Sequence, residues 1–516
     1  MRRLLILSTC AISLFAQSRP KLIVALVIDQ FRYDYLVRFR PEYHYGLARL
    51  LDQGAVFTNA HHEFFPTVTA LGHATYLTGA SPSVTGIVGN EWYDREKKKS
   101  VTSVSDDATK LVGGVPGAKG SSPRKLLVDT FGDELKLEGV PSKVIGISIK
   151  DRSSILPAGH MADAAYWFDN DSNHFVSSTY YMKELPAWVK AIDDAHPAAK
   201  YLGAEWHALD AKPGDQPFCT LVGGTEIRYC GTLEATPWGN ELLEEFAENA
   251  IANERLGQHD GTDLLTLSLS SNDYVGHAVG PDAPEVRDIS IRTDRLIGKL
   301  LDLLDAQVGR GNVLVVLTAD HGVVSAPEVN EERRMPGGRL DPEEMAGKIE
   351  AALNARFGKA HWIAWHSYGM FYLDYETIAK LHADKAEVRR VAAEAARAYP
   401  HIARVFTRDQ LMRGEAGNDP VSRAMNLGFY APRAADIEVL QEPYYIFSTT
   451  TTGSTHGTPY IYDTHVPVIL YGAGITHGVY SDRVAVTQIA PTLAALLHTE
   501  PPSGAFSPIL PHILEH

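Results

Sequence analysis

Positive charge, cysteine and long apolar segments are all scarce in this 516-residue sequence. Lys and Arg number 48 against 63 Asp and Glu, which gives a formal net charge of -15. This deficit argues against a nucleic-acid-binding surface, so we expect no nucleic-acid partner. Low-complexity tracts and obvious repeats are also missing. The length suits one large α/β domain with insertions, or two or three smaller domains.

The one apolar segment of note near the N-terminus, Leu4–Ala16, is too short to span a bilayer. Two arginines precede it, and the small residues of Ala16-Gln17-Ser18 follow it. This pattern predicts a signal peptide over residues 1–18, hence a periplasmic or secreted protein without membrane insertion after cleavage. A lipoprotein box ending at Cys10 is the alternative, but the apolar run before this cysteine is too short.

Of the three cysteines, Cys10 leaves with the signal peptide. Cys219 and Cys230 are close in sequence, and an oxidising compartment favours a disulfide that closes a small loop between them. The alternative is two free buried thiols.

Continuous apolar runs rich in β-branched residues predict strands that are buried on both faces of a parallel sheet. Ligand sites in such sheets lie at the carboxyl ends of the strands. The predicted strands are Lys21–Ile28, Lys143–Ile149, Asp263–Leu269, Asn312–Leu317 and Val466–Leu470.

The remaining segments predict helices, an irregular region and an insertion. Helical spacing is present in Leu126–Leu137, Glu241–Arg255, Glu285–Asp305 and Val484–Leu497. Ala158–Cys230 is aromatic and rich in loops, so we expect irregular structure over the sheet. Residues 325–442 are interpreted as an inserted α+β subdomain, which leaves 19–324 and 443–516 for the core.

The segment Phe64–Gly79 predicts a loop that leads into a helix, with Thr69 at the N-cap. A hydroxyl there faces the positive end of the helix dipole, where a phosphate is favoured. The alternative is that Thr69 only caps the helix. Asn90 follows in a loop punctuated by glycines, where its amide could bind an anion or make a turn.

Two cations, Lys150 and Arg152, stand on alternate residues just beyond a predicted strand. We expect them to point the same way and to clamp a tetrahedral anion. The alternative is an ordinary polar strand end.

Ionisable residues also follow the other predicted strands. Each has a simpler explanation by itself, such as a helix cap at Asp29, but together they supply three Asp and three His at one edge of a sheet. This is a suitable ligand set for two zinc ions. The residues are Asp29, Asp273, His277, Asp320, His321 and His456.

The order of these residues resembles the metal-and-nucleophile signature of the alkaline phosphatase superfamily, over roughly Lys21 to Leu497. The sequence is most similar to the branch shared by type I phosphodiesterase/nucleotide pyrophosphatases and Thr-nucleophile bacterial alkaline phosphatases (PafA type). In both groups a Thr opens a helix, and an Asn follows past a T-G-x-x-P-x-x-x-G-I loop. Here these residues are Thr69 and Asn90.

The resemblance implies an alkaline-phosphatase-like α/β fold, with a central, mostly parallel sheet flanked by helices and an inserted small α+β subdomain. It implies two zinc ions (Zn2+) and a phosphothreonine intermediate on Thr69. One zinc is expected to be held by Asp273, His277 and His456, and the other by Asp29, Asp320, His321 and the oxygen of Thr69. His73, His160 and His465 are not assigned to metal; we expect structural or supporting roles for them.

The pair Lys150 and Arg152 resembles the Lys-x-Arg pair with which the phosphomonoesterases of this branch bind the outer phosphate oxygens, together with Asn90. We therefore expect hydrolysis of small-molecule phosphate monoesters. Separately, we expect the protein to be a monomer. A phosphodiesterase or nucleotide pyrophosphatase on the same scaffold is the main alternative. A non-catalytic zinc- or phosphate-binding protein would have no need of Thr69, and the C/S-x-P-x-R context of sulfatases is absent.

Overall fold

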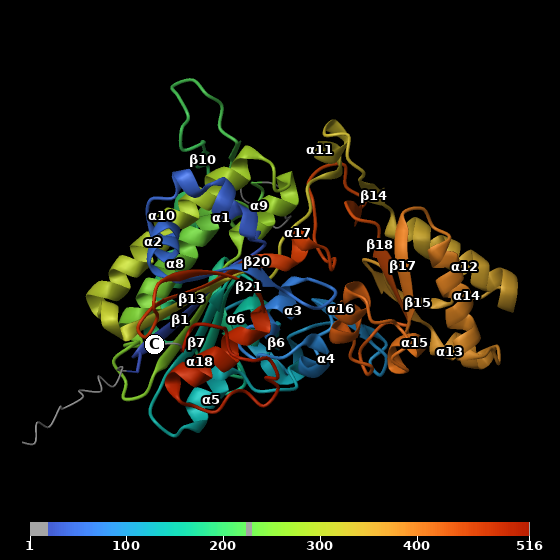
Figure 1. The fold of residues 1–516 in the computed structure, drawn as a ribbon, viewed down its shortest axis with the longest axis horizontal. Helices are drawn as coiled ribbons and strands as arrows, with labels where there is room; N and C mark the ends of the chain where they lie inside the picture. The colour runs from blue at the N-terminus through green and yellow to red at the C-terminus, as the bar shows by residue number, and fades with distance from the viewer. Residues whose placement is uncertain (1–18, 223–229, 515–516) are drawn as a thin grey trace, which may run out of the picture.

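A computed structural model describes residues 19–222 and 230–514, and its main element is an eleven-stranded sheet (Figure 1). The predicted signal peptide lies outside the described residues. From one edge to the other, the strands are β21 (Gly478–Ala485), β2 (Ala55–His61), β20 (His465–Gly472), β13 (Val313–Thr318), β1 (Leu22–Ile28), β12 (Asp263–Leu269), β7 (Val144–Ser148), β8 (Ala164–Asp169), β9 (His174–Ser178), β5 (Ser105–Val112) and β6 (Lys119–Ser121).

The centre of the sheet, from β13 through β1, β12 and β7 to β8, is parallel. The prediction of a mostly parallel α/β sheet is confirmed, and four of the predicted strands are found within one residue of their expected ends. The fifth, Val466–Leu470, belongs to the longer strand β20, which runs antiparallel between β13 and β2. The central strands are fully buried because helices cover both faces of the sheet.

Figure 1 shows α2 (Gly46–Gln53), α8 (Pro237–Asn253) and α10 (Pro284–Gln307) over one face of the sheet. The other face is covered by α5 (Phe131–Leu137), α6 (Asp151–Ala158) and α18 (Ile489–Leu497). Two of these helices are shorter than predicted. α5 begins only after Thr130, which caps it, and residues 484–485 belong to β21 rather than to α18. Within the described residues, no helix has the length and apolarity needed to cross a membrane.

The prediction that Ala158–Cys230 is irregular is wrong for its first half. This segment contains the sheet strands β8 and β9 and the helix α7 (Ala187–Asp194). Of the aromatic residues that suggested a surface layer, Trp167 is buried in the core, whereas Tyr180, Tyr181 and Trp188 are half-buried. The predicted disulfide is present between Cys219 and Cys230, whose Cα atoms lie 6.1 Å apart.

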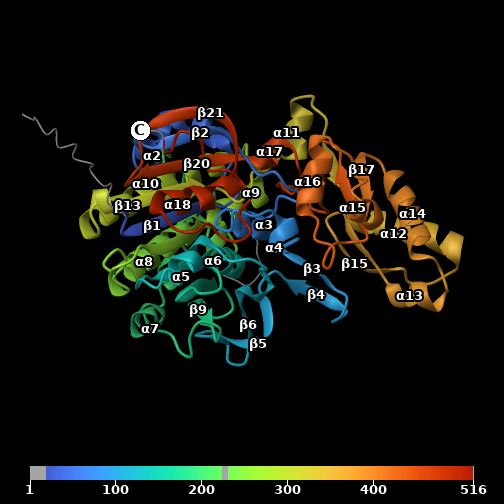
Figure 2. The ribbon, with the colours of Figure 1, turned by 60° about the horizontal axis from the view of Figure 1, so that its bottom comes forward.

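A second, antiparallel sheet lies at one end of the molecule (Figures 1 and 2). Its strands are β15 (Ile363–Ser367), β16 (Met370–Leu373), β18 (Ile437–Gln441) and β17 (Ile402–Thr407). They pack with α12 (Pro342–Phe357) and α14 (Lys385–Arg397) around a separate hydrophobic cluster. Strands β15 and β16 pair with each other as an antiparallel hairpin. Beside this sheet, β14 (Gly338–Leu340) pairs with β19 (Tyr445–Phe447).

Strand register brings the carboxyl ends of the central strands to one level. Ile28 pairs with Leu269, and Val27 pairs with Thr318. The Asp29 amide then donates a hydrogen bond to the Leu269 carbonyl at 3.1 Å. The residues that follow β1, β12 and β13 therefore meet at the same edge of the sheet, as the sequence predicts.

Candidate active site

Thr69 is the first residue of helix α3 (Thr69–Thr75), and Val68 occupies the N-cap that was predicted for it. The hydroxyl of Thr69 is therefore not used as a cap. It is buried, and its Oγ1 lies 3.4 Å from His321 Nε2. Helix α3 comes very close to the loop after β13: a Cβ atom at Gly72 would lie only 2.2 Å from the Asp320 carbonyl oxygen, so the close approach requires glycine there. This contact fixes Thr69 beside the residues that follow β13.

Asn90 is joined to the start of the same helix. Its Oδ1 accepts a hydrogen bond of 2.8 Å from the Ala70 amide. The oxygen is engaged there, which leaves the two N–H donors of the side chain for other partners, and Asn90 lines the cleft. Thr69 and Asn90 are thereby held as a unit, with a hydroxyl and an amide donor close together.

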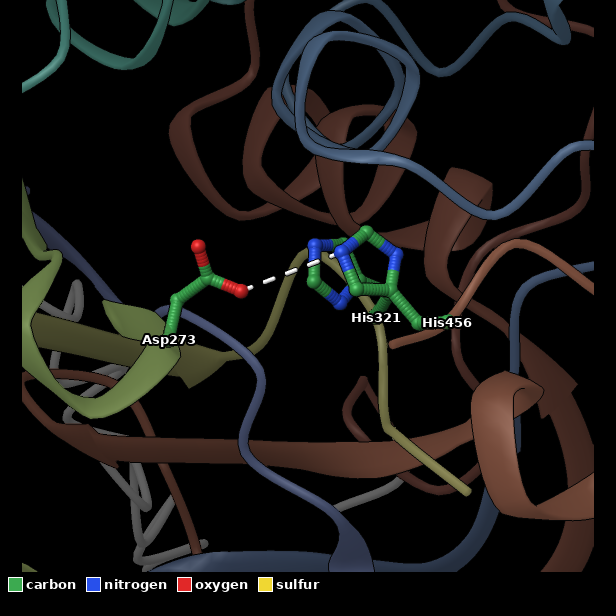
Figure 3. Close-up of side chains that lie close together, drawn as sticks. All are labelled: Asp273, His321 and His456. Carbon is green, nitrogen blue, oxygen red and sulfur yellow. Dashed lines mark ion pairs between the residues drawn. The ribbon is translucent and has the colours of Figure 1, made fainter. Parts of the chain in front are cut away.

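Two groups of candidate metal ligands lie next to Thr69. The possible ligand atoms of Asp273, His321 and His456 are all within 4.8 Å of one another, and the same holds for Asp29, His73 and Asp320. Asp273 belongs to α9 (Ser271–Val279), which follows β12. Figure 3 shows its carboxylate pointing toward the two stacked imidazoles, with Oδ1 3.8 Å from His456 Nε2.

The hydrogen bonds of three histidines orient their rings in the same way. Nδ1 of His277, His321 and His456 lies 2.9, 3.0 and 2.8 Å, respectively, from a backbone carbonyl oxygen. A carbonyl can only accept, so Nδ1 carries the proton and Nε2 is left with its lone pair. In each ring Nε2 is the atom near a carboxylate: Asp273 for His277 and His456, and Asp320 for His321. This arrangement is typical of histidines that bind metal.

His321 lies between the two groups of ligands. Its ring is stacked on His456 with the centroids 3.4 Å apart, while its Nε2 is 3.2 Å from Asp320 Oδ2. The grouping by distance thus differs from the expected one, which assigns His321 to the site of Asp29 and Asp320. His277 is close to the first group through the 3.2 Å separation of its Nε2 from Asp273 Oδ1.

His73 enters the second group by distance, but both of its ring nitrogens are engaged. Nδ1 contacts the Thr69 carbonyl at 3.0 Å, and Nε2 contacts Ser268 Oγ at 3.1 Å. Ser268 in turn donates to Asp29 Oδ1 at 2.5 Å. A supporting role between Asp29 and helix α3 therefore describes this histidine better than that of a ligand.

Lys150 and Arg152 make different contacts in the structure, and their expected joint clamp on an anion stays a prediction. Helix α6 begins at Asp151, and successive helical residues do not alternate between two faces as strand residues do. Nζ of Lys150 lies 3.0 Å from Asp29 Oδ2 and 2.5 Å from Asp273 Oδ2. Lys150 is thus paired with one carboxylate from each side of the site.

Arg152 instead lines the cleft. Within the described part of the chain, its buried Nε atom has no hydrogen-bond partner. A buried guanidinium N–H without an acceptor is costly, and an oxyanion would satisfy it.

Several ionisable side chains are buried close together in the site, and they shift one another's pKa values. Burial alone would lower the pKa of Lys150, but Asp273 and Asp29 outweigh it and raise this pKa. Burial would likewise raise the pKa of Asp273, but Lys150 and His277 hold it well below its usual range. Burial, together with the neighbouring His321 and His277, keeps the pKa of His456 well below its ordinary value, so this imidazole is neutral.

Gln30 is a site residue that the sequence did not single out. It has φ +59° and is buried. Its amide N–H donates to Asp320 Oδ1 at 3.0 Å, and its Nε2 donates to Asp273 Oδ1 at 2.8 Å. Gln30 thus orients a carboxylate from each group, Asp320 through its backbone N–H and Asp273 through its side chain. In the sequence, only its position directly after Asp29 could have indicated that Gln30 belongs to the site.

Comparison with known proteins gives a consistent result. A family model described as type I phosphodiesterase / nucleotide pyrophosphatase matches residues 23–465. Alkaline phosphatase PafA of Elizabethkingia meningoseptica is 36% identical over 95% of this chain and 94% of that protein. Alkaline phosphatase PhoV of Synechococcus elongatus is 34% identical over 98% of this chain and 95% of that protein.

Solved structures agree with these sequence matches. A crystal structure of wild-type alkaline phosphatase PafA superposes with a TM-score of 0.89 at 35% identity, covering 96% of this chain and 98% of that chain. A PafA variant with one Thr, one Asn, one Lys and one Arg substituted superposes with a TM-score of 0.88 at 34% identity, again over 96% of this chain and 98% of that one.

Proposed function

The chain belongs to the type I phosphodiesterase / nucleotide pyrophosphatase family, and from this premise we propose that it is a metal-dependent phosphomonoesterase. Its likeness to alkaline phosphatases over nearly its whole length supports this activity. The substrates are phosphate monoesters of small molecules. The nucleophile is the Thr69 hydroxyl, and the reaction passes through a phosphothreonine.

Two zinc ions fit the donor set. Three buried aspartates and three histidines converge there, and each histidine keeps Nε2 available while Nδ1 is bound to a carbonyl. Carboxylates and neutral imidazoles are ligands that zinc prefers. In our assignment Asp273, His277 and His456 hold one ion, and Asp29, Asp320, His321 and Thr69 hold the other. When bound, such ions lower the pKa of a ligated hydroxyl and neutralise charge on the departing oxygen.

Three side chains position the phosphate and react with it. Thr69 Oγ1 forms the new bond to phosphorus while the bond from phosphorus to the ester oxygen breaks, so the alcohol leaves on the opposite side. Asn90 Nδ2 and the Arg152 guanidinium donate to the non-bridging oxygens. Water then cleaves the phosphothreonine, which releases phosphate and restores the hydroxyl.

The single observation that carries the preference for monoesters is the buried, unpartnered Nε of Arg152, which lines the cleft close to Lys150 in sequence. A monoester dianion brings one more negative charge than a diester, so a cationic side chain there favours the monoester. The four residue types substituted in the PafA variant match Thr69, Asn90, Lys150 and Arg152, which supports this set. The name of the matching family favours the alternative, a phosphodiesterase.

We also place the enzyme outside the cytoplasm, in the periplasm or secreted. The leader pattern of residues 1–18 and the disulfide between Cys219 and Cys230 support this location.

The decisive experiment compares an aryl phosphate monoester with the matching diester, using purified protein and added zinc. We expect kcat/KM to be higher for the monoester by orders of magnitude, and Thr69→Ala to abolish turnover while inorganic phosphate still binds. Thr69→Ser, which keeps a hydroxyl, is the matched control and retains part of the activity. A higher value for the diester would assign the protein to the phosphodiesterases. Zinc binding without any turnover would contradict an enzymatic role.

A further inference from the structure

The cleft above the candidate active site continues onto the second sheet. It has a volume of about 350 Å³, and Asn90, Arg152, His277 and His456 are among the residues that line it. Residues of the turn between β15 and β16 and of β18 and β19 line it as well. A phosphate held by Asn90 and Arg152 would therefore direct its ester group into the space between the two sheets.

The wall that the second sheet and β19 contribute to this cleft is mostly apolar, with Ser367 and Gln441 as its polar side chains. Tyr368, Met370, Val439 and Phe447 line it. Among the described residues that line the cleft, Arg152 is the only Lys or Arg and Glu91 is the only carboxylate. No further cation is present in this set to hold a second phosphate or another anionic group. The wall is suited to an uncharged leaving group with a large apolar face.

The backbone at Tyr368 shows that this aromatic residue is placed there at a cost. Ser367 pairs with Met370, so Tyr368 and Gly369 form a two-residue turn, and both have positive φ, +45° and +89°. Such turns favour Asn, Asp or Gly, because a side chain with a bulky ring is strained at positive φ. The ring is also 66% exposed, so burial in the hydrophobic core does not offset the strain.

The turn is held in a fixed position against the second sheet. The Val439 amide donates a hydrogen bond of 2.9 Å to the Gly369 carbonyl. A Cβ at Gly369 would lie 2.8 Å from the Val439 carbonyl oxygen and 2.9 Å from Phe447 Cε2, so only glycine fits there. The hairpin therefore presents Tyr368 at one place in the cleft instead of leaving it on a loose loop.

We propose that Tyr368, with Met370 and Phe447, forms a leaving-group subsite for phosphate monoesters whose alcohol carries a planar aromatic group. The inference rests on the proposed phosphomonoesterase function and specifies its substrate class. The aromatic ring of the alcohol packs against the exposed face of Tyr368 while the phosphate is held at Arg152. Tyr368 is thus a specificity-determining residue.

The test compares phenyl phosphate with methyl phosphate, and phenylphosphonate with methylphosphonate as inhibitors, on the zinc-loaded enzyme. For Tyr368→Ala and Tyr368→Asn we expect kcat/KM for phenyl phosphate to fall, and Ki for phenylphosphonate to rise, by roughly tenfold, as for the loss of one aromatic contact. Values for the methyl compounds and for inorganic phosphate stay unchanged. Tyr368→Phe keeps the ring and behaves like the wild type.

Two controls exclude a general effect on the fold. Tyr368→Asn relieves the positive φ, so its Tm should equal or slightly exceed that of the wild type. Phe506→Ala replaces a residue that is 79% exposed and lies outside the cleft. It should change neither kcat/KM for phenyl phosphate relative to methyl phosphate nor Ki for phenylphosphonate relative to methylphosphonate. Equal loss for phenyl and methyl compounds, or no loss for either, would overturn the subsite while leaving the phosphatase intact. If the wild type hydrolyses neither ester, the proposed function fails, and the dissociation constants of the two phosphonates, measured by titration calorimetry, still decide on the subsite.

Discussion

The ammonium nitrogen of Lys150 lies 2.5 Å from Oδ2 of Asp273, and both side chains are almost completely buried. A cation that was expected to face an incoming phosphate is therefore paired with a candidate metal ligand. The second partner, Asp29 at 3.0 Å, belongs to the other ligand group. Lys150 thus compensates negative charge on both sides of the site at once.

Lys150→Ala should reduce discrimination between esters. The ammonium adds positive charge where a monoester carries one more negative charge than a diester. We expect kcat/KM for an aryl monoester to fall by about 100-fold and that for the diester by less than about tenfold. Steady-state kinetics on both esters measures this. Lys200→Ala, which removes an exposed lysine paired with Glu245, is the control. An equal decrease for both esters would show that Lys150 acts only through the fold.

Removal of metal should abolish turnover and lower thermal stability together. Asp29, Asp273 and Asp320 are buried close together, and Lys150 is paired with only the first two of them. At metal concentrations about 1,000 times Kd, each bound ion contributes about 4 kcal/mol to the free energy of unfolding. A chelator titration followed by calorimetry and activity measurements tests this. Zinc should restore both quantities, whereas magnesium should not, because imidazole ligands suit zinc. Full activity after exhaustive chelation would contradict a metal site.

Gln30→Gly should weaken metal binding. Glycine accepts the positive φ of this position, so the variant removes mainly the side-chain donor that orients Asp273. Loss of such a supporting hydrogen bond typically costs 10- to 100-fold in metal affinity or activity, and we expect about tenfold. Competition with a chromogenic chelator measures the affinity without relying on turnover.

The control for this variant is Asn173→Gly, which introduces glycine at another position with positive φ, away from the site. It should leave metal affinity unchanged. Gln30 would have no role in orienting the ligands if both variants bound zinc as the wild type does.

Glu438→Gln should change how stability depends on pH. Burial raises the pKa of Glu438 to about 7 from its ordinary value of 4.5, and Arg408 opposes only part of this effect. A carboxyl with a raised pKa stabilises the folded state below pH 4.5, and this contribution is lost as pH rises through 7. Above that pH the cost is about 3 kcal/mol.

Unfolding free energies at several pH values, from denaturant titration, test this expectation. The variant should exceed the wild type at pH values well above 7, and the difference should vanish in acid. Glu332→Gln, at an exposed position, should give a difference that does not vary with pH. A constant difference for Glu438→Gln as well would show that this carboxyl does not titrate as proposed.

The sheet was predictable where apolar runs were long and ended in ionisable residues. β1, β12 and β13 were found this way because β-branched runs buried on both faces leave a continuous signal. β8 and β9 were missed because Ala164–Asp169 and His174–Ser178 mix aromatic residues with polar ones and lie among turns. Part of their burial comes from Phe246 of α8, which packs on Tyr166 and Phe175 from a later part of the chain and which local pattern does not reveal.

The sequence predicted most of the residues that belong to the candidate site, but not which of their side chains contact one another. Residue types and their positions after strands suggested Asp29, Asp273 and Asp320. The direction of Lys150 depended on a helix that begins one residue later, and the role of Gln30 depended on its left-handed backbone. Both are consequences of tertiary packing. The wall at Tyr368 lies about 300 residues from Thr69 in sequence, so no short-range pattern connects the two.

The antiparallel pairing of β13 with β20 gives the molecule a modular topology. Everything between these two neighbouring strands is one enlarged hairpin connection that leaves and re-enters the sheet at adjacent positions. Its two roots carry Asp320, His321 and His456, while its distal part carries Tyr368. Replacement of the distal part, in evolution or by design, would therefore change which esters are accepted. The topology of the parallel strands that carry the candidate active site would stay the same.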